Sequence, residues 1–120
     1  MKRNVVLTVM SLLTLLLLIV HITQDFIHQP DGTNLYPIPV IIFAVWLYAT
    51  LMLSDKVSGL IIMFVGGLFG AGMIIAHSRG FVVGNARGFF FVFTLFALST
   101  TGWVTMILAV RSLWTKFRER

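Results

Sequence analysis

The chain has 120 residues, of which 58% are hydrophobic and only 11% are charged, with a formal net charge of +5 and no cysteine. An ordinary soluble domain carries roughly 25% charged residues, and a chain this short has too little interior to hide so much apolar surface. The composition therefore excludes a soluble globular domain. The lack of cysteine excludes a disulfide framework, thiol catalysis and a thiolate metal site.

Four apolar runs occupy most of the chain, and none of them contains an acidic or basic side chain. Their approximate bounds are Val5–Val20, Pro39–Leu53, Val57–Ala76 and Phe89–Val110. A hydrocarbon core about 30 Å thick needs about 20 helical residues, or fewer when the helix ends snorkel. The sequence predicts an all-α integral membrane protein, a single domain over 1–120 with four transmembrane helices over approximately 4–26, 38–54, 56–78 and 88–114. The predicted partner of these helices is the lipid bilayer.

The first run also resembles the core of a secretory signal peptide, because it follows the basic residues Lys2 and Arg3. The residues after it, from His21 to Asp25, do not form the pattern of small residues that a signal peptidase cuts. We therefore expect an uncleaved first helix.

The basic residues fall unevenly on the two sides of the predicted helices. An up-down-up-down arrangement places both termini on the same side as the link around Asp55, which is so short that the second and third helices must be neighbours. That side carries seven of the nine basic residues, and the other side carries Arg79 and Arg87. Because loops rich in Lys and Arg stay in the cytoplasm, both termini are predicted to be cytoplasmic. In a bacterium this multi-pass protein would lie in the inner membrane.

The positive charge does not indicate a nucleic-acid partner, because the basic residues cap apolar runs and form no stripe with interleaved aromatic residues. Anchoring at anionic headgroups explains them better. The sequence contains no GxSxG, P-loop, dinucleotide or HExxH motif, so it does not predict an enzyme. A small four-helix drug exporter is excluded as well, because such exporters depend on a carboxylate within the first helix.

Small residues gather along the third run. Gly66 and Gly70 form a GxxxG pair, and Gly67 and Ala71 repeat the spacing. Such residues let helix backbones approach closely in lipid, where hydrophobic attraction between helices is missing. We expect them to pack against the second or fourth helix of the same chain. The alternative is a seam between two copies of the chain in a homo-oligomer.

Polar groups also lie deep within two of the runs. The hydroxyls of Ser99–Thr101 and Thr105 can bond to a carbonyl one turn earlier or to another helix. Since no ionisable residue accompanies them, they predict helix packing and bending rather than a substrate path. Trp46 and Trp103 lie deep enough that their indole N–H groups should need a partner.

The three histidines are all predicted at the outer membrane face. His21, Asp25 and His28 stand at i, i+4 and i+7 on one stripe of the first helix, and His77 ends the third helix at a similar height. Imidazole and carboxylate groups are ligands of zinc, copper and iron. The minimal divalent-metal site is His21 and Asp25, completed by His77. His28 is the poorer ligand, because about 10.5 Å of helix separates it from His21.

Other interpretations of these residues stay open at this point. His21 and His77 could hold a haem as axial ligands or contact a quinone, or the cluster could sense pH. The simplest interpretation is that polar residues collect where a helix leaves the membrane and meet water and headgroups. A membrane enzyme that uses His21 and Asp25 as a base pair is a poorer option, because no nucleophile or oxyanion stabiliser is evident beside them. The sequence thus leaves two main hypotheses. One is a non-enzymatic accessory, structural or assembly subunit, alone or within a larger membrane complex, and the other is a metal- or haem-binding membrane protein.

Overall fold

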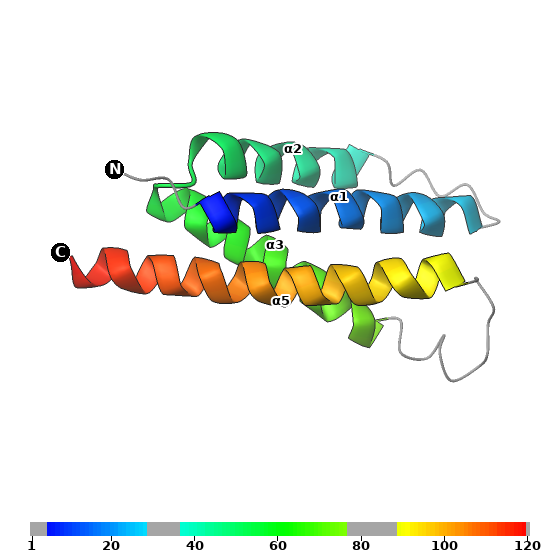
Figure 1. The fold of residues 1–120 in the computed structure, drawn as a ribbon. Helices are drawn as coiled ribbons and strands as arrows, with labels where there is room; N and C mark the ends of the chain where they lie inside the picture. Colours follow the sequence, from blue (N-terminus) through cyan, green and yellow to red (C-terminus); the bar gives the residue numbers. More distant parts are fainter. Residues whose placement is uncertain (1–4, 29–36, 77–88, 120) are drawn as a thin grey trace.

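In this computed structural model, the structure describes residues 5–28, 37–76 and 89–119, with side chains described within 5–23, 38–75 and 92–119. The described residues form four helices, α1 (Val5–His28), α2 (Pro37–Met52), α3 (Val57–Ala76) and α5 (Phe89–Arg118). Figure 1 shows that successive helices run in opposite directions, and that α1 begins at the end of the molecule where α5 finishes. The predicted all-α class is confirmed.

Three of these helices are long and apolar enough to cross a membrane, over Val5–Thr23, Val57–Ile75 and Val92–Arg118. The apolar stretch of α2, Ile38–Met52, is shorter. Its 16-residue helix rises about 24 Å, which is less than a hydrocarbon core of about 30 Å. The chain therefore has the helices of a multi-pass membrane protein.

The helix ends differ slightly from the prediction. α2 begins at Pro37, so Pro39 also lies in its first turn, where backbone N–H groups have no acceptor within the helix and a proline removes no hydrogen bond. α5 continues to Arg118, about one turn beyond the expected end. Its last turn contains Lys116 and Arg118, which the negative end of the helix dipole favours.

α2 and α3 are in contact, as the short link between them predicted. Lys56 N–H donates to the Leu53 carbonyl at 2.9 Å and closes the turn between them. Gly59 permits this approach, because a Cβ at that position would overlap the Leu53 carbonyl oxygen.

Helix contacts are distributed unequally over the chain. α5 packs against α3 and α1, and among the described helices α2 contacts only α1 and α3. The first and last helices are therefore neighbours, and α2 lies at the edge of the molecule (Figure 1). Along α2, only Trp46, Ala49 and Thr50 are buried, and its other large side chains are mostly exposed and apolar. Lipid is the solvent that suits such a surface.

Candidate functional site

One stripe of α1 faces the interior of the molecule along most of its length. The five residues of this stripe have no exposed surface, and they are Leu7, Ser11, Thr14, Leu18 and His21. Their spacing of four, three, four and three keeps them on one face of the helix. Three of the five are polar, so this stripe carries hydrogen-bonding groups into an apolar interior.

Ser11 joins α1 to α2 through a closed ring of hydrogen bonds. Trp46 Nε1–H donates to Ser11 Oγ at 2.9 Å, and Ser11 Oγ lies 2.8 Å from Thr50 Oγ1. The Thr50 hydroxyl donates to the Trp46 carbonyl at 2.9 Å, so its only proton is used and Ser11 must donate to Thr50. The expectation that the Trp46 indole needs a partner is confirmed, and Ser11 is that partner. Trp103 instead lies on the outer face of α5 with 53% of its surface exposed.

Thr14 joins α1 to α5 in the same way. Its hydroxyl donates to the Met10 carbonyl at 2.7 Å, and Thr105 Oγ1 lies 3.0 Å away. Because the Thr14 proton is already used, Thr105 donates to Thr14. Nearer the start of α5, the Ser99 hydroxyl donates to the Ala71 carbonyl of α3 at 3.2 Å. The hydroxyls of Thr100 and Thr101 donate to carbonyls of α5 itself, 2.9 Å away at Phe96 and Ala97. Both kinds of predicted bond, to a carbonyl one turn earlier and to another helix, are therefore present.

The small residues of α3 are buried where other helices approach it. Gly66 lies under the Trp46 ring of α2, and a Cβ there would overlap the ring. A Cβ at Gly70 would lie 3.0 Å from the methyl group of Thr14 on α1. Gly66 and Gly70 are therefore buried against other helices of the same chain.

The backbones of α3 and α5 approach closely at Gly67, Ala71 and Gly102. A Cβ on Gly67 would lie 2.8 Å from the Gly102 carbonyl oxygen, and a Cβ on Gly102 would lie 2.5 Å from the Ala71 backbone nitrogen. Gly102 was not among the packing residues predicted from the sequence. A lone glycine among hydroxyl residues inside an apolar helix is the signal that could have indicated it.

Of the four candidate ligands, His21 is the one whose side chain the structure describes. It is 0% exposed and falls within the membrane-crossing stretch Val5–Thr23. The interpretation that polar residues here simply meet water and headgroups therefore does not fit His21, because its whole side chain is buried. An ionisable side chain at such a position is uncommon and usually serves a function.

The rest of the predicted metal set lies wholly or partly outside the described residues. Asp25 and His28 have backbones in α1, one and two turns beyond His21, but their side chains are outside the described part. His77 lies outside it altogether. Among the side chains that the structure describes, no three of the His, Asp and Glu type gather at one point. His77 completing a site with His21 thus stays a prediction.

The described interior is suited to holding helices together. Its hydrogen bonds connect α1 to α2, α1 to α5 and α5 to α3, and its glycines remove the side chains that would keep the backbones apart. Among the described residues that are buried and polar, His21 is the one that can ionise. Comparison of the chain with protein-family models, with curated proteins and with solved structures finds no match.

Proposed function

We propose that this chain is a non-enzymatic membrane protein that acts as an accessory, structural or assembly subunit. Its four helices cross the bilayer up-down-up-down, and both termini are cytoplasmic. The observation that carries the proposal is the use of the interior polar groups. The protons of the Ser11 and Thr14 hydroxyls and of the Trp46 indole are all donated within the chain, so the centre is occupied by helix-to-helix bonds.

The outer surface supports the same proposal. Large apolar side chains are exposed on every described helix, including Leu16 on α1, Tyr48 on α2, Leu68 on α3 and Ile107 on α5. Such a surface suits lipid and the apolar helices of a larger membrane complex. α2 crosses despite its length, because a short helix is accommodated by local thinning of the bilayer at modest cost.

The topology is tested by placing single cysteines in this cysteine-free chain and labelling intact cells with a membrane-impermeant maleimide. Cysteine at Thr33 or Ser78 is expected to be labelled at once, because both positions face outward in the proposed topology. Cysteine at Lys56 or Arg118 is expected to react only after the membrane is permeabilised. Positions 33 and 78 found on opposite sides would contradict the four-crossing arrangement.

A metal- or haem-binding role is the second candidate, and the complete burial of His21 inside a membrane-crossing stretch favours it. In that case His21 and His77 hold the group, with Asp25 as a further ligand for a divalent metal. The imidazoles would supply nitrogen ligands from two helices at similar depth.

Metal analysis and a visible absorption spectrum of the detergent-purified protein separate the two candidates. The subunit role predicts substoichiometric metal and no Soret band. The second candidate predicts one metal ion per chain or a Soret band, lost in His21→Leu and in His77→Leu and kept in the control His28→Leu. A stoichiometric metal or haem signal that depends on His21 would refute the non-binding role.

A further inference from the structure

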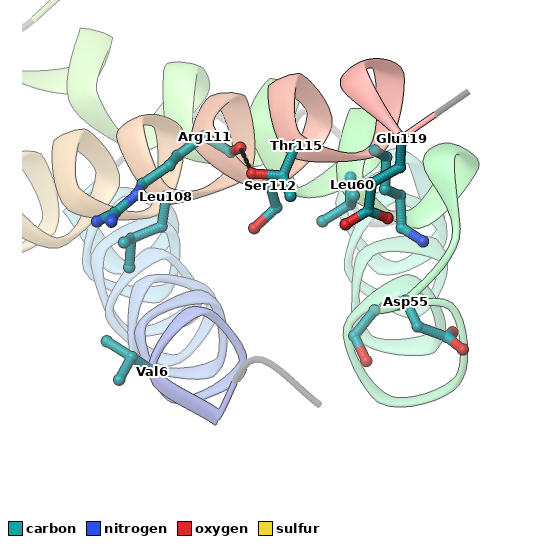
Figure 2. Close-up of a pocket in the computed structure, with 10 residues that line it drawn as sticks. Val6, Asp55, Leu60, Leu108, Arg111, Ser112, Thr115 and Glu119 are labelled. Carbon is teal, nitrogen blue, oxygen red and sulfur yellow. Dashed lines mark hydrogen bonds between the residues drawn. The ribbon is translucent and has the colours of Figure 1, made fainter. Parts of the chain in front are cut away.

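A cavity of about 580 Å³ opens at the end of the molecule where α1 begins and α5 finishes (Figure 2). Its apolar wall consists of Val6 on α1, Leu60 on α3 and Leu108 on α5. Its polar wall comes from the last turns of α5 and from the link between α2 and α3. The volume falls within the range of roughly 300–1,000 Å³ that is typical of ligand sites.

The position of the cavity along α5 places it at the edge of the hydrocarbon core. The stretch Val92–Val110 contains no charged residue and rises about 28 Å, close to the thickness of that core. Arg111 follows at once and is the first charged residue on the described part of α5. The apolar wall therefore meets acyl chains, and the polar wall lies at the depth of the lipid headgroups.

Charges of both signs line this cavity. Arg111 and Lys116 supply two cations, and Asp55 and Glu119 supply two carboxylates. Within the described residues, no ion pair joins any two of these four side chains. The bond drawn in Figure 2 runs from the Thr115 hydroxyl to the Arg111 carbonyl, at 3.0 Å, and leaves the guanidinium uninvolved.

The Arg111 guanidinium is also separated from the two carboxylates across the cavity. Figure 2 shows Arg111 on the side of Val6, whereas Asp55 and Glu119 lie on the side where α3 begins. A ligand that matches this arrangement carries a negative group at one end and a positive group at the other. A purely anionic ligand would be repelled by both carboxylates.

We propose that this cavity binds the headgroup of a zwitterionic phospholipid that carries one phosphate and one primary ammonium. Arg111 contacts the phosphate, and Asp55 and Glu119 accept hydrogen bonds from the ammonium. The acyl chains leave along Val6 and Leu108 into the bilayer. A primary ammonium donates three N–H bonds to the carboxylates, whereas a quaternary ammonium donates none, so the site distinguishes the two headgroups.

Native mass spectrometry of the delipidated protein in detergent tests the proposal with lipids of identical acyl chains. Phosphatidylethanolamine is expected to bind at one molecule per chain, about fivefold more tightly than phosphatidylcholine or phosphatidylglycerol, as one added charge contact at headgroup depth provides. Equal binding of the three lipids, or tighter binding of phosphatidylglycerol, would overturn the assignment.

Variants show whether Arg111, Asp55 and Glu119 are responsible. Asp55→Asn and Glu119→Gln are each expected to reduce phosphatidylethanolamine binding to the level of phosphatidylcholine and to leave the latter unchanged. Arg111→Gln is expected to weaken all three phospholipids about fivefold. The matched control is Arg118→Gln, because Arg118 is a cation on the same helix that does not line the cavity. Arg118→Gln and Arg111→Gln behaving alike would refute a specific site.

Soluble phosphoethanolamine distinguishes a lipid from a free phosphate ester. It carries the same two charged groups without acyl chains, so it should displace phosphatidylethanolamine only at far higher concentration, because it gains nothing from Val6, Leu60 and Leu108. Displacement at equal concentration would show that the site serves a soluble metabolite, and the lipid proposal would be wrong. Helical content measured by circular dichroism confirms that each variant is folded.

Discussion

Replacing Trp46 by alanine is expected to detach α2 from the rest of the molecule. Trp46 is only 2% exposed, lies over Gly66 of α3 and donates its indole N–H to Ser11 of α1. Since α2 contacts only α1 and α3 among the described helices, this one side chain touches both of its neighbours. Truncating a buried tryptophan to alanine costs about 3–5 kcal/mol, and here the ring of hydrogen bonds is lost as well.

Unfolding by SDS in mixed micelles, followed by circular dichroism, measures the loss for Trp46→Ala. Trp103→Ala is the matched control, because it removes the same side chain from the outer face of α5 and is expected to change stability by no more than about 0.5 kcal/mol. Trp46→Phe keeps most of the ring and removes the N–H donor, so a loss of about 1 kcal/mol is expected. Equal effects of Trp46→Ala and Trp103→Ala would contradict the described packing of α2.

Gly102→Ala is expected to push α3 and α5 apart where their backbones approach closely. The added Cβ would lie 2.5 Å from the Ala71 nitrogen and 2.7 Å from the Gly67 carbonyl oxygen. Both atoms belong to the backbone, so no rotamer change can relieve the overlap and one helix must move. Overpacking of this kind costs about 1–3 kcal/mol. The same SDS titration should show the variant unfolding at a lower SDS fraction.

Gly72→Ala is the control for this prediction. A Cβ at Gly72 would meet no atom within 4 Å, and alanine is favoured over glycine within a helix by up to about 1 kcal/mol. We therefore expect Gly72→Ala to be neutral or slightly stabilising. If Gly72→Ala were as harmful as Gly102→Ala, the exposed part of α3 would be in contact with something outside this chain, and the intramolecular account of these glycines would fail.

The sequence predicted more about Trp46 than about Gly102. Depth alone indicated that the Trp46 indole needs a partner, because an unpaired N–H in an apolar medium is unfavourable. The identity of that partner, Ser11, was hidden, since a lone serine in an apolar run has no pattern that points across to another helix. Gly102 was hidden for a similar reason, because its partner Gly67 lies on a helix far away in the chain.

The candidate site was predictable only in part. The regular spacing of His21, Asp25 and His28 follows from the sequence, and the described part of their stripe continues it inward through Leu18 and Thr14. The complete burial of His21 did not follow, because the length of an apolar run does not show how far the neighbouring helices extend beside it. Tertiary packing therefore changed a residue expected at the water boundary into an interior one.

By itself, the sequence determined that lipid surrounds this protein, that it is helical and where its helices approximately begin and end. These depend on local properties, since an uncharged apolar run must satisfy its backbone hydrogen bonds internally and does so as a helix. Only the tertiary structure decided that α1 and α5 are neighbours, that α2 lies at the edge and which face of each helix is buried. In lipid, the buried and exposed faces of a helix are both apolar, so hydrophobic periodicity carries little information about packing. Small residues and hydroxyls decide it through contacts between helices distant in sequence.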